Sequence, residues 1–159
     1  MKTRKNVKGF TLVELIVVIA IIGVLAAILV PSMLGYVKKS KVSSMNANAK
    51  NLFDAVATSL VEMDSNGSNV SDGNYGYASG GAAGSMNSAI HNFFADADKL
   101  TAKTGTLGAG GGWYTVAGMA VTAATASDGV YAGGYPKQAT VDNYASYYGI
   151  AGLTQAARS

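Results

Sequence analysis

The feature that most limits how this chain can fold is an apolar run of 23 residues between Glu14 and Lys38. The run, LIVVIAIIGVLAAILVPSMLGYV, carries no formal charge. As an α-helix it would be about 35 Å long, enough to cross a hydrocarbon core of about 30 Å. Positive charge lies on its N-terminal side, at Lys2, Arg4, Lys5 and Lys8, with no acid among them. The positive-inside rule therefore predicts that this end stays in the cytoplasm and that the C-terminal part is exported.

A secretory signal peptide is the alternative interpretation of this N-terminus, with Ala26 and Ala27 imitating a small-residue cleavage site. Two observations argue against it. The apolar run exceeds the 7–15 residues, roughly, of an ordinary signal-peptide core, and it continues beyond Ala27. A carboxylate, Glu14, also lies at its start.

The composition excludes several classes of protein. The chain has 159 residues, is 49% hydrophobic and 13% charged, and contains no cysteine. A disulfide-stapled mini-protein, a cysteine-based zinc site and a thiol nucleophile are therefore excluded. Nucleic-acid binding is not indicated, because the chain has only eight Lys/Arg and as many as nine Asp/Glu once the four leader cations are set aside. The largest basic cluster that remains is Lys38, Lys39 and Lys41.

Gly23 and Pro31 interrupt the apolar helix. Glycine costs about 1 kcal/mol relative to alanine inside a helix. Proline lacks an N–H donor and crowds the carbonyl four residues earlier, here that of Ala27. We therefore expect residues 23–31 to form the least secure turns, with a kink or local melting.

Beyond Pro31 the helix becomes amphipathic, with one apolar stripe at helical spacing. The stripe consists of Met45, Ala49, Leu52, Val56, Leu60 and Met63, widened by Phe53 and Val61. Polar residues, among them Asn46, fall between or opposite these positions. The turn residues of Asp64–Gly67 end the helix.

The C-terminal part combines glycine-rich loops with strand patterns. Residues 65–88 are predicted to be a long loop, and a short helix over Met86–Leu100 is expected to bury Ile90, Phe93, Phe94, Ala97 and Leu100. Alternation over residues 113–121 predicts a strand, and a turn at Ser127–Gly129 separates it from strand candidates at Val130–Tyr135 and Ala139–Ile150.

These patterns predict an α+β fold in which an antiparallel sheet of three or four strands packs on the amphipathic helix half. Four segments follow: a basic leader at residues 1–9, a hydrophobic transmembrane or filament-core helix at 10–37, the amphipathic half at 38–64, and a globular head at 65–159.

The most informative motif is KGFTLVEL at residues 8–15. It resembles the processing site of type IV prepilins and of the related pseudopilins of type II secretion systems. Their pattern is a short basic leader ending in glycine, then Phe-Thr-Leu-(Val/Ile)-Glu, then an apolar helix. The resemblance covers roughly residues 1–55. It implies cleavage between Gly9 and Phe10 by a membrane-embedded aspartic prepilin peptidase, followed by N-methylation of the new Phe10 amine.

A role for Glu14 follows from charge and distance. A carboxylate at the centre of a membrane helix costs about 2.5–3.5 kcal/mol. Cleavage would create a cationic amine at Phe10, about 6 Å along the helix. We expect Glu14 of one subunit to pair with the Phe10 amine of a neighbour, so that Glu14 acts in assembly and not in catalysis. The alternative is that Glu14 snorkels to the lipid headgroups.

Other candidate sites carry weaker signals. His91 is the only histidine and lacks a nucleophile motif. Gly105–Gly112 matches no phosphate-binding pattern. Side-chain oxygens that could bind calcium lack the EF-hand spacing; they belong to Asp64, Asn66, Asp72 and Asn74. We therefore expect no enzyme activity, no cofactor and no bound metal.

The expected function is that of a structural subunit of a type IV pilus used for adhesion, twitching motility or DNA uptake. The alternative is a pseudopilin of a type II secretion or competence system. The resemblance implies as partners further copies of the chain, the prepilin peptidase and N-methyltransferase, an assembly platform and an ATPase. It implies insertion in the cytoplasmic membrane before assembly and an extracellular filament afterwards.

Overall fold

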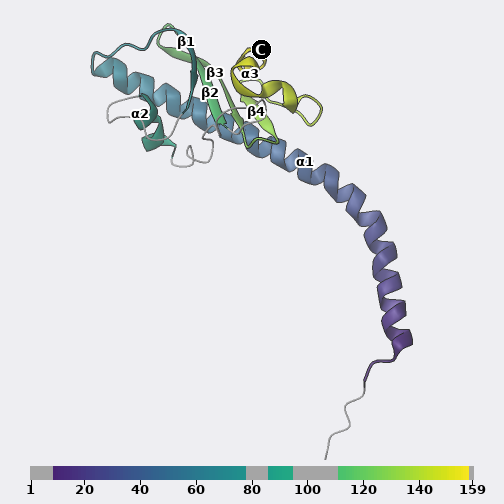
Figure 1. Cartoon of the computed structure of the whole chain (residues 1–159). Helices are drawn as coiled ribbons and strands as arrows, with labels where there is room; N and C mark the ends of the chain where they lie inside the picture. The colour runs from purple at the N-terminus through teal and green to yellow at the C-terminus, as the bar shows by residue number, and fades with distance from the viewer. Residues whose placement is uncertain (1–8, 78–85, 95–110, 158–159) are drawn as a thin grey trace, which may run out of the picture. The chain divides into compact units, whose positions relative to one another are not determined.

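The structure is a computed structural model and describes residues 9–77, 86–94 and 111–157. The chain divides into two compact units between Val37 and Lys38. Its elements, in chain order, are α1 (Leu12–Ser65), β1 (Gly73–Gly76), α2 (Met86–Phe93), β2 (Gly111–Ala117), β3 (Ala120–Ser127), β4 (Ala132–Tyr135), the 3₁₀ helix η2 (Tyr144–Tyr147) and α3 (Gly149–Ala156). A long N-terminal helix with a small antiparallel sheet makes this an α+β protein of the type IV pilin kind, as the sequence predicted (Figure 1).

The first half of α1 is apolar and exposed. An 18-residue window has a mean hydropathy of 3.1, and none of it is buried, so the helix is long and apolar enough to cross a membrane. The helix continues without interruption through Gly23 and Pro31. The local melting expected there is absent from this structure. Whether these turns are weaker in an assembled filament stays a prediction.

The second half of α1 buries the predicted stripe, with two corrections. Met45, Ala49, Leu52, Val56 and Leu60 are buried, whereas Met63 is only half-buried. Val61, expected to widen the stripe, is 71% exposed. Asn46, expected between or opposite the apolar positions, is buried instead, because its amide forms hydrogen bonds that compensate for the loss of water.

The C-terminus of α1 is closed by the turn that the sequence predicted. Gly67 has a φ of 72°, in the left-handed region that glycine enters without a steric penalty. The Gly67 N–H donates to the Asp64 carbonyl at 3.0 Å, and the Ser68 N–H donates to the Met63 carbonyl at 2.9 Å. This pair of bonds is the Schellman arrangement, which satisfies carbonyls that lack a partner inside the helix.

The sheet has four antiparallel strands in the order β1-β2-β3-β4. The strand predicted over residues 113–121 is in fact a hairpin, because the chain reverses between Ala117 and Ala120, which pair with each other. Gly118 and Met119 form the two-residue turn, each with a φ of 58°. Positive φ at both positions is the backbone geometry that suits the twist of a tight hairpin.

Three other local expectations were wrong. The predicted loop at 65–88 contains the edge strand β1. Helix α2 ends at Phe93, which is 50% exposed and not buried as expected, whereas Ile90 and Phe94 are buried. The remaining expected positions, Ala97 and Leu100, lie outside the described residues.

The segment Ala139–Ile150 was expected to be a strand but forms a turn followed by η2 and the first residues of α3. Local hydrogen bonds explain the difference. The Asn143 side-chain oxygen accepts from the Thr140 N–H at 2.7 Å, and the Tyr144 N–H donates to the Thr140 carbonyl at 3.0 Å. These bonds satisfy backbone groups that a strand would have paired with a neighbour.

Two hydrophobic clusters hold the head together. The larger joins α1 to the inner face of the sheet, where Leu52, Val56 and Leu60 meet Tyr114 and Val116. The smaller cluster joins Val42 with Ala123, Ala132, Tyr147 and Leu153, and so connects α1, the sheet and the C-terminal helices. The amphipathic half of α1 is therefore an integral part of the core of the head.

Candidate functional site

The predicted processing site, Gly9–Phe10, lies just before α1 in a segment without regular secondary structure. Gly9 and Phe10 precede the helix, and Phe10 is 86% exposed. A Cβ placed on Gly9 would meet no atom within 4 Å. The peptide bond between the two residues is therefore unobstructed by the described chain. The leader cations at residues 1–8 lie outside the described residues.

Thr11 and Glu14 form a capping box at the start of α1. The Thr11 N–H donates to Glu14 Oε2 at 2.8 Å, and the Thr11 hydroxyl donates to the same oxygen at 2.7 Å. In return, the Glu14 N–H donates to Thr11 Oγ1 at 3.3 Å. Sequence reasoning selected Glu14 but missed Thr11, although a threonine three residues before a glutamate is the recognised signal for this motif.

The capping box places the Glu14 carboxylate at the N-terminal end of the helix. That end carries the positive pole of the helix dipole, which favours a negative charge. Both hydrogen bonds from Thr11 reach Oε2, and Oε1 accepts none from the part of the chain that the structure describes. One carboxylate oxygen therefore stays open to a donor from outside the subunit.

Large apolar side chains surround this part of α1 on all sides and are more than 45% exposed. They include Leu12, Val13, Leu15, Ile16, Val17, Val18, Ile19, Ile21, Ile22, Val24, Leu25, Ile28, Leu29, Val30, Met33, Leu34 and Val37. A surface of this size and polarity is compatible with lipid or with other apolar helices, and it is not stable in water.

Pro31 and Gly23, the other two residues selected from the sequence, lie inside this apolar helix. A Cβ at Gly23 would meet nothing within 4 Å, so no packing inside the described chain requires glycine there. Ser32 follows Pro31, and its hydroxyl donates to the Leu29 carbonyl at 2.8 Å. That bond satisfies a polar side chain within an apolar surface.

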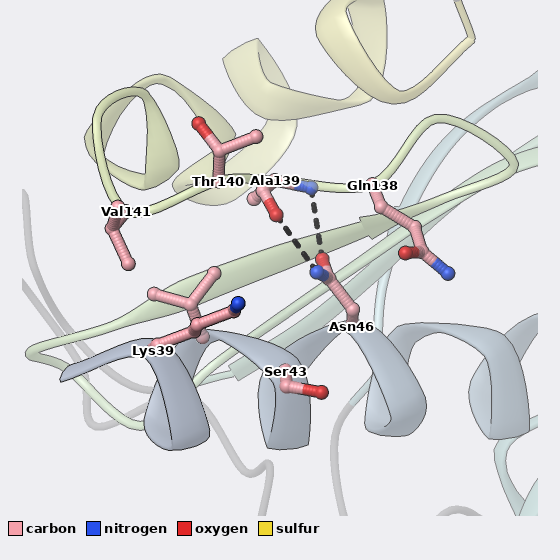
Figure 2. A pocket seen from close by; sticks show the side chains of 8 residues that line it. Lys39, Ser43, Asn46, Gln138, Ala139, Thr140 and Val141 are labelled. Carbon is pink, nitrogen blue, oxygen red and sulfur yellow. Dashed lines mark hydrogen bonds between the residues drawn. The ribbon is translucent and has the colours of Figure 1, made fainter. Parts of the chain in front are cut away.

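A second polar site, which sequence reasoning missed, lies in the head at Asn46. Figure 2 shows the Asn46 side chain rising from α1 toward the segment that follows β4. Its Oδ1 accepts from the Gly134 N–H at 3.0 Å and the Ala139 N–H at 2.9 Å, and its Nδ2 donates to the Ala139 carbonyl at 2.8 Å. No sequence pattern pointed to this site, since Asn46 was expected between or opposite the apolar positions of the stripe.

A cavity of about 370 Å³ lies beside this amide, between α1 and the segment after β4. It is lined by Lys39, Val42, Ser43, Asn46, Gln138, Ala139, Thr140 and Val141 (Figure 2). The lining combines one cation with neutral amides and hydroxyls. It contains no carboxylate and no histidine, so it offers no general acid or base of ordinary strength.

The weaker candidate sites remain dispersed. His91 is exposed on α2. Asp72 Oδ1 accepts from the Gly118 N–H at 2.7 Å, and Asn74 Oδ1 accepts from the Thr115 hydroxyl at 2.7 Å. Both oxygens are therefore engaged in hydrogen bonds to β2 and the turn that follows it. Within residues 9–77, 86–94 and 111–157, no three His, Asp or Glu side chains gather in a group able to hold a metal. Of the glycine run 105–112, only Gly111 and Gly112 are described, and they begin β2.

An exposed apolar helix with a capped carboxylate at its start, continued by an amphipathic half that carries a four-stranded sheet, defines a type IV pilin-like protein. Comparison with known proteins agrees. The family described as "Prokaryotic N-terminal methylation motif" matches residues 4–30. This N-terminal segment therefore resembles that of type IV prepilins.

Three curated relatives illustrate the similarity. The "Type IV major fimbrial protein FimA" of Dichelobacter nodosus is 44% identical over 55 residues, which is 35% of this chain and 35% of the relative. The "Type IV major pilin protein PilA" of Myxococcus xanthus is 44% identical over 57 residues, 36% of this chain and 26% of the relative. The "Fimbrial protein" of Moraxella nonliquefaciens is 46% identical over 66 residues, 42% of this chain and 40% of the relative.

The matched regions thus span between a quarter and two fifths of these relatives. No solved structure matches the chain. The similarity to these relatives therefore concerns the segment that carries the methylation motif and the residues directly after it.

Proposed function

We propose that this chain is the subunit of a type IV pilus, made as a membrane-inserted prepilin and polymerised through its N-terminal helix. The observation that carries the proposal is the KGFTLVEL segment, with an exposed Gly9–Phe10 bond, followed at once by a capped Glu14 and an exposed apolar helix. The names of the relatives, which are major pilins and fimbrial proteins, support the same assignment.

The first proposed step is processing at the membrane face. A prepilin peptidase hydrolyses the peptide bond between Gly9 and Phe10 and releases residues 1–9. The new Phe10 amine then receives a methyl group. Residues 1–9 remain in the cytoplasm because of their charge, and the chain from residue 38 onward is exported. Before assembly, the apolar half of α1 lies in the cytoplasmic membrane.

The second proposed step is assembly, in which Glu14 recognises a neighbouring subunit. The capping box already turns the carboxylate toward the helix N-terminus, where the Phe10 amine of another copy approaches. Pairing neutralises two charges that are costly in an apolar environment. It also fixes the stagger between adjacent helices, as a buried polar residue fixes register in a coiled coil. The apolar surfaces of many copies then cover one another in the filament core.

The filament is an open helical polymer, because each copy offers one surface and accepts another in a head-to-tail manner. An assembly platform and an ATPase are the partners that such growth requires. The heads form the outer surface, where adhesion, motility or DNA uptake would take place. The role of the chain is structural and not catalytic.

The N-terminal mass of the protein in sheared surface material tests this proposal. Cells that carry the native gene are sheared, and the filament and membrane fractions are compared by mass spectrometry. We expect an abundant chain that begins at methylated Phe10 in the sheared filaments. Methylated Phe10 confined to the membrane fraction would favour the alternative, a pseudopilin of a secretion or competence system. An intact leader, or cleavage beyond Ala27, would overturn the assignment.

A second experiment separates processing from assembly. The variant Glu14→Gln keeps the size of the side chain but removes the charge that pairs with the amine. We expect normal cleavage and membrane insertion with little protein in sheared filaments. The matched control is Asp142→Asn, which removes an exposed carboxylate from the head. Normal incorporation of Glu14→Gln into filaments would refute the proposed role of Glu14.

A further inference from the structure

The cavity beside Asn46 is lined by polar side chains that lie along one side of α1. Lys39, Ser43 and Asn46 are spaced by four and three residues, so they follow one another on the same side of the helix. Figure 2 shows the Lys39 ammonium and the Gln138 amide reaching into the space between α1 and the segment after β4. Asn46 holds that segment in place through its two hydrogen bonds to Ala139. The cavity is therefore bounded by a fixed main chain and by polar side chains.

Three of these polar groups are donors that the chain itself does not use. Within the part of the chain that the structure describes, the Lys39 ammonium forms no ion pair. It shares with the Ser43 hydroxyl and the Gln138 amide the absence of any hydrogen bond to a described residue. All three residues are exposed, and the lining contains no carboxylate that would compete for the ammonium. An open cation with neutral donors beside it suits a phosphate group, whose oxygens accept strong hydrogen bonds.

The same cavity offers an apolar surface next to these donors. Val42, Ala139 and Val141 also line it. Its volume of about 370 Å³ is more than one phosphate ion fills and falls in the range of small-molecule sites, roughly 300–1,000 Å³. A free phosphate ion gains nothing from contact with carbon, whereas a phosphate ester can bury its CH₂ groups there. The lining therefore fits a phosphate that is carried on a carbon skeleton.

The place of Lys39 in the chain indicates the source of such a phosphate. Lys39 is two residues after Val37, the last residue of the apolar run. Two residues span at most about 7 Å, and the headgroup layer on each side of the hydrocarbon core is about 5–7 Å thick. With the apolar run inserted in a membrane, Lys39 therefore lies in the headgroup layer or at its border. The phosphates nearest to the cavity are then those of phospholipids.

The charge around the cavity favours an anionic lipid over a zwitterionic one. Lys38, Lys41 and Lys137 are sequence neighbours of its lining, and residues 38–53 contain no acid. The acid nearest to the lining in the sequence is Asp142, which is exposed and is not a lining residue. Clusters of lysine next to a membrane helix attract anionic headgroups.

We propose that this cavity binds the headgroup of an anionic phospholipid of the outer leaflet. The Lys39 ammonium pairs with the phosphate, Ser43 and Gln138 donate hydrogen bonds to the headgroup oxygens, and the glycerol carbons contact the apolar lining. The inference rests on the proposed membrane insertion of the apolar half of α1. A bound lipid ties the start of the head to the leaflet, so a subunit that leaves the membrane must first release it.

Native mass spectrometry of the full-length chain in dodecyl maltoside tests the proposal, because it counts the lipids that each chain retains. The probes are dioctanoyl phosphatidylglycerol, dioctanoyl phosphatidylcholine and inorganic phosphate. We expect one phosphatidylglycerol per chain, bound about tenfold more tightly than phosphatidylcholine, whose own ammonium neutralises the phosphate charge. Equal binding of the two lipids would overturn the proposal. Displacement of phosphatidylglycerol by inorganic phosphate would also overturn it, since the site would then take a free anion.

Two variants separate the cavity from a general attraction by lysines. Lys39→Gln removes the ammonium, and Ser43→Phe keeps every charge but fills the space beside it. Each should weaken phosphatidylglycerol binding about tenfold, the effect of losing one hydrogen bond to a charged group. Lys39→Arg keeps the charge and should bind within about threefold of the native chain. The matched control Lys41→Gln removes an exposed lysine of the same cluster that does not line the cavity, and it should also stay within about threefold.

The outcomes separate this inference from the proposed function. Native binding by Lys39→Gln and Ser43→Phe would overturn the cavity as the lipid site. A loss in Lys41→Gln equal to that in Lys39→Gln would overturn it too, because the whole cluster would then attract the lipid. Neither result touches the pilus assignment, which depends on methylated Phe10 in sheared filaments. A native chain that binds phosphatidylglycerol but never appears in sheared filaments would overturn the pilus assignment and support the lipid site.

Discussion

The side-chain amide of Asn46 and the main chain of Ala139 bind each other through both of their polar groups. The Asn46 Nδ2 donates to the Ala139 carbonyl at 2.8 Å, and the Ala139 N–H donates to Asn46 Oδ1 at 2.9 Å. The same oxygen also accepts from the Gly134 N–H. One helical side chain thus pairs with three backbone groups as a neighbouring strand would; Figure 2 shows the two bonds to Ala139. This side chain fixes where the end of the sheet meets α1.

We predict that Asn46→Leu destabilises the head by about 3 kcal/mol or more. The substitution keeps the size of the side chain but leaves three buried backbone groups without partners, each at a cost of about 1–3 kcal/mol. Thermal unfolding of the detergent-solubilised full chain, followed by near-ultraviolet circular dichroism, measures the effect. The matched control Asn51→Leu changes an exposed asparagine of the same helix. Equal unfolding temperatures for the two variants would contradict the role of Asn46.

Gly133 allows β4 to approach the backbone of α1 directly. A Cβ at this position would overlap the Asn46 nitrogen and the Met45 carbonyl carbon, and it would lie 2.6 Å from the Met45 oxygen. We predict that Gly133→Ala destabilises the head by about 1–3 kcal/mol or more, because a helix backbone cannot move aside as a side chain can. Gly73→Ala is the control, since its Cβ would be 3.6 Å from the nearest atom. The same unfolding assay decides, and a Gly133→Ala variant as stable as the control would refute the close approach.

Tyr114 should titrate well above an ordinary tyrosine. Burial, with a smaller contribution from the neighbouring Tyr75, raises the pKa of Tyr114 from 10.0 to about 12. Because the folded value lies above the unfolded one, the associated stability is fully present below pH 10 and is lost as the pH rises toward 12. The difference in absorbance at 295 nm between the native chain and Tyr114→Phe isolates this group. A difference curve with its midpoint near pH 10 would show that the phenol is not protected.

Thr11 should matter for assembly and not for processing. In Thr11→Val the hydroxyl that donates to Glu14 is lost while the branched shape is kept, and loss of such a cap costs about 1 kcal/mol. The first turn then frays and the carboxylate is held less firmly, so we expect a several-fold lower yield of sheared filaments with normal cleavage after Gly9. Thr11→Ser retains the hydroxyl and should assemble normally. If the valine and serine variants give the same yield, the capping box is irrelevant to assembly.

Much of the architecture follows from patterns that extend over many residues. The uncharged run predicts the exposed half of α1, and repeated apolar spacing predicts the buried positions from Met45 to Leu60. Long periodic segments are informative because many positions independently indicate which face of the helix is buried and which is exposed. The motif at residues 8–15 is equally informative, since it places Gly9, Phe10 and Glu14 in a fixed order.

The remaining features depend on single contacts between distant residues, and a one-dimensional pattern does not contain them. Asn46 has the polarity of an exposed residue, and the backbone groups of Gly134 and Ala139 make its burial favourable. The reversal at Gly118 and Met119 interrupts an alternation that continues unbroken in the sequence. The turn built by Asn143 likewise replaces a predicted strand, because one side-chain oxygen competes successfully with sheet pairing.

The separation of 93 positions between Asn46 and Ala139 has a consequence for how the protein is made. Synthesis starts at the N-terminus, so α1 is complete long before its last packing partner exists. During that interval the stripe from Met45 to Leu60 is as uncovered as the apolar segment before it. Nascent chains of this protein therefore pass through an aggregation-prone stage. That stage lasts until the sheet residues that cover the stripe, such as Tyr114 and Val116, have been made, and a chain terminated before them never leaves it.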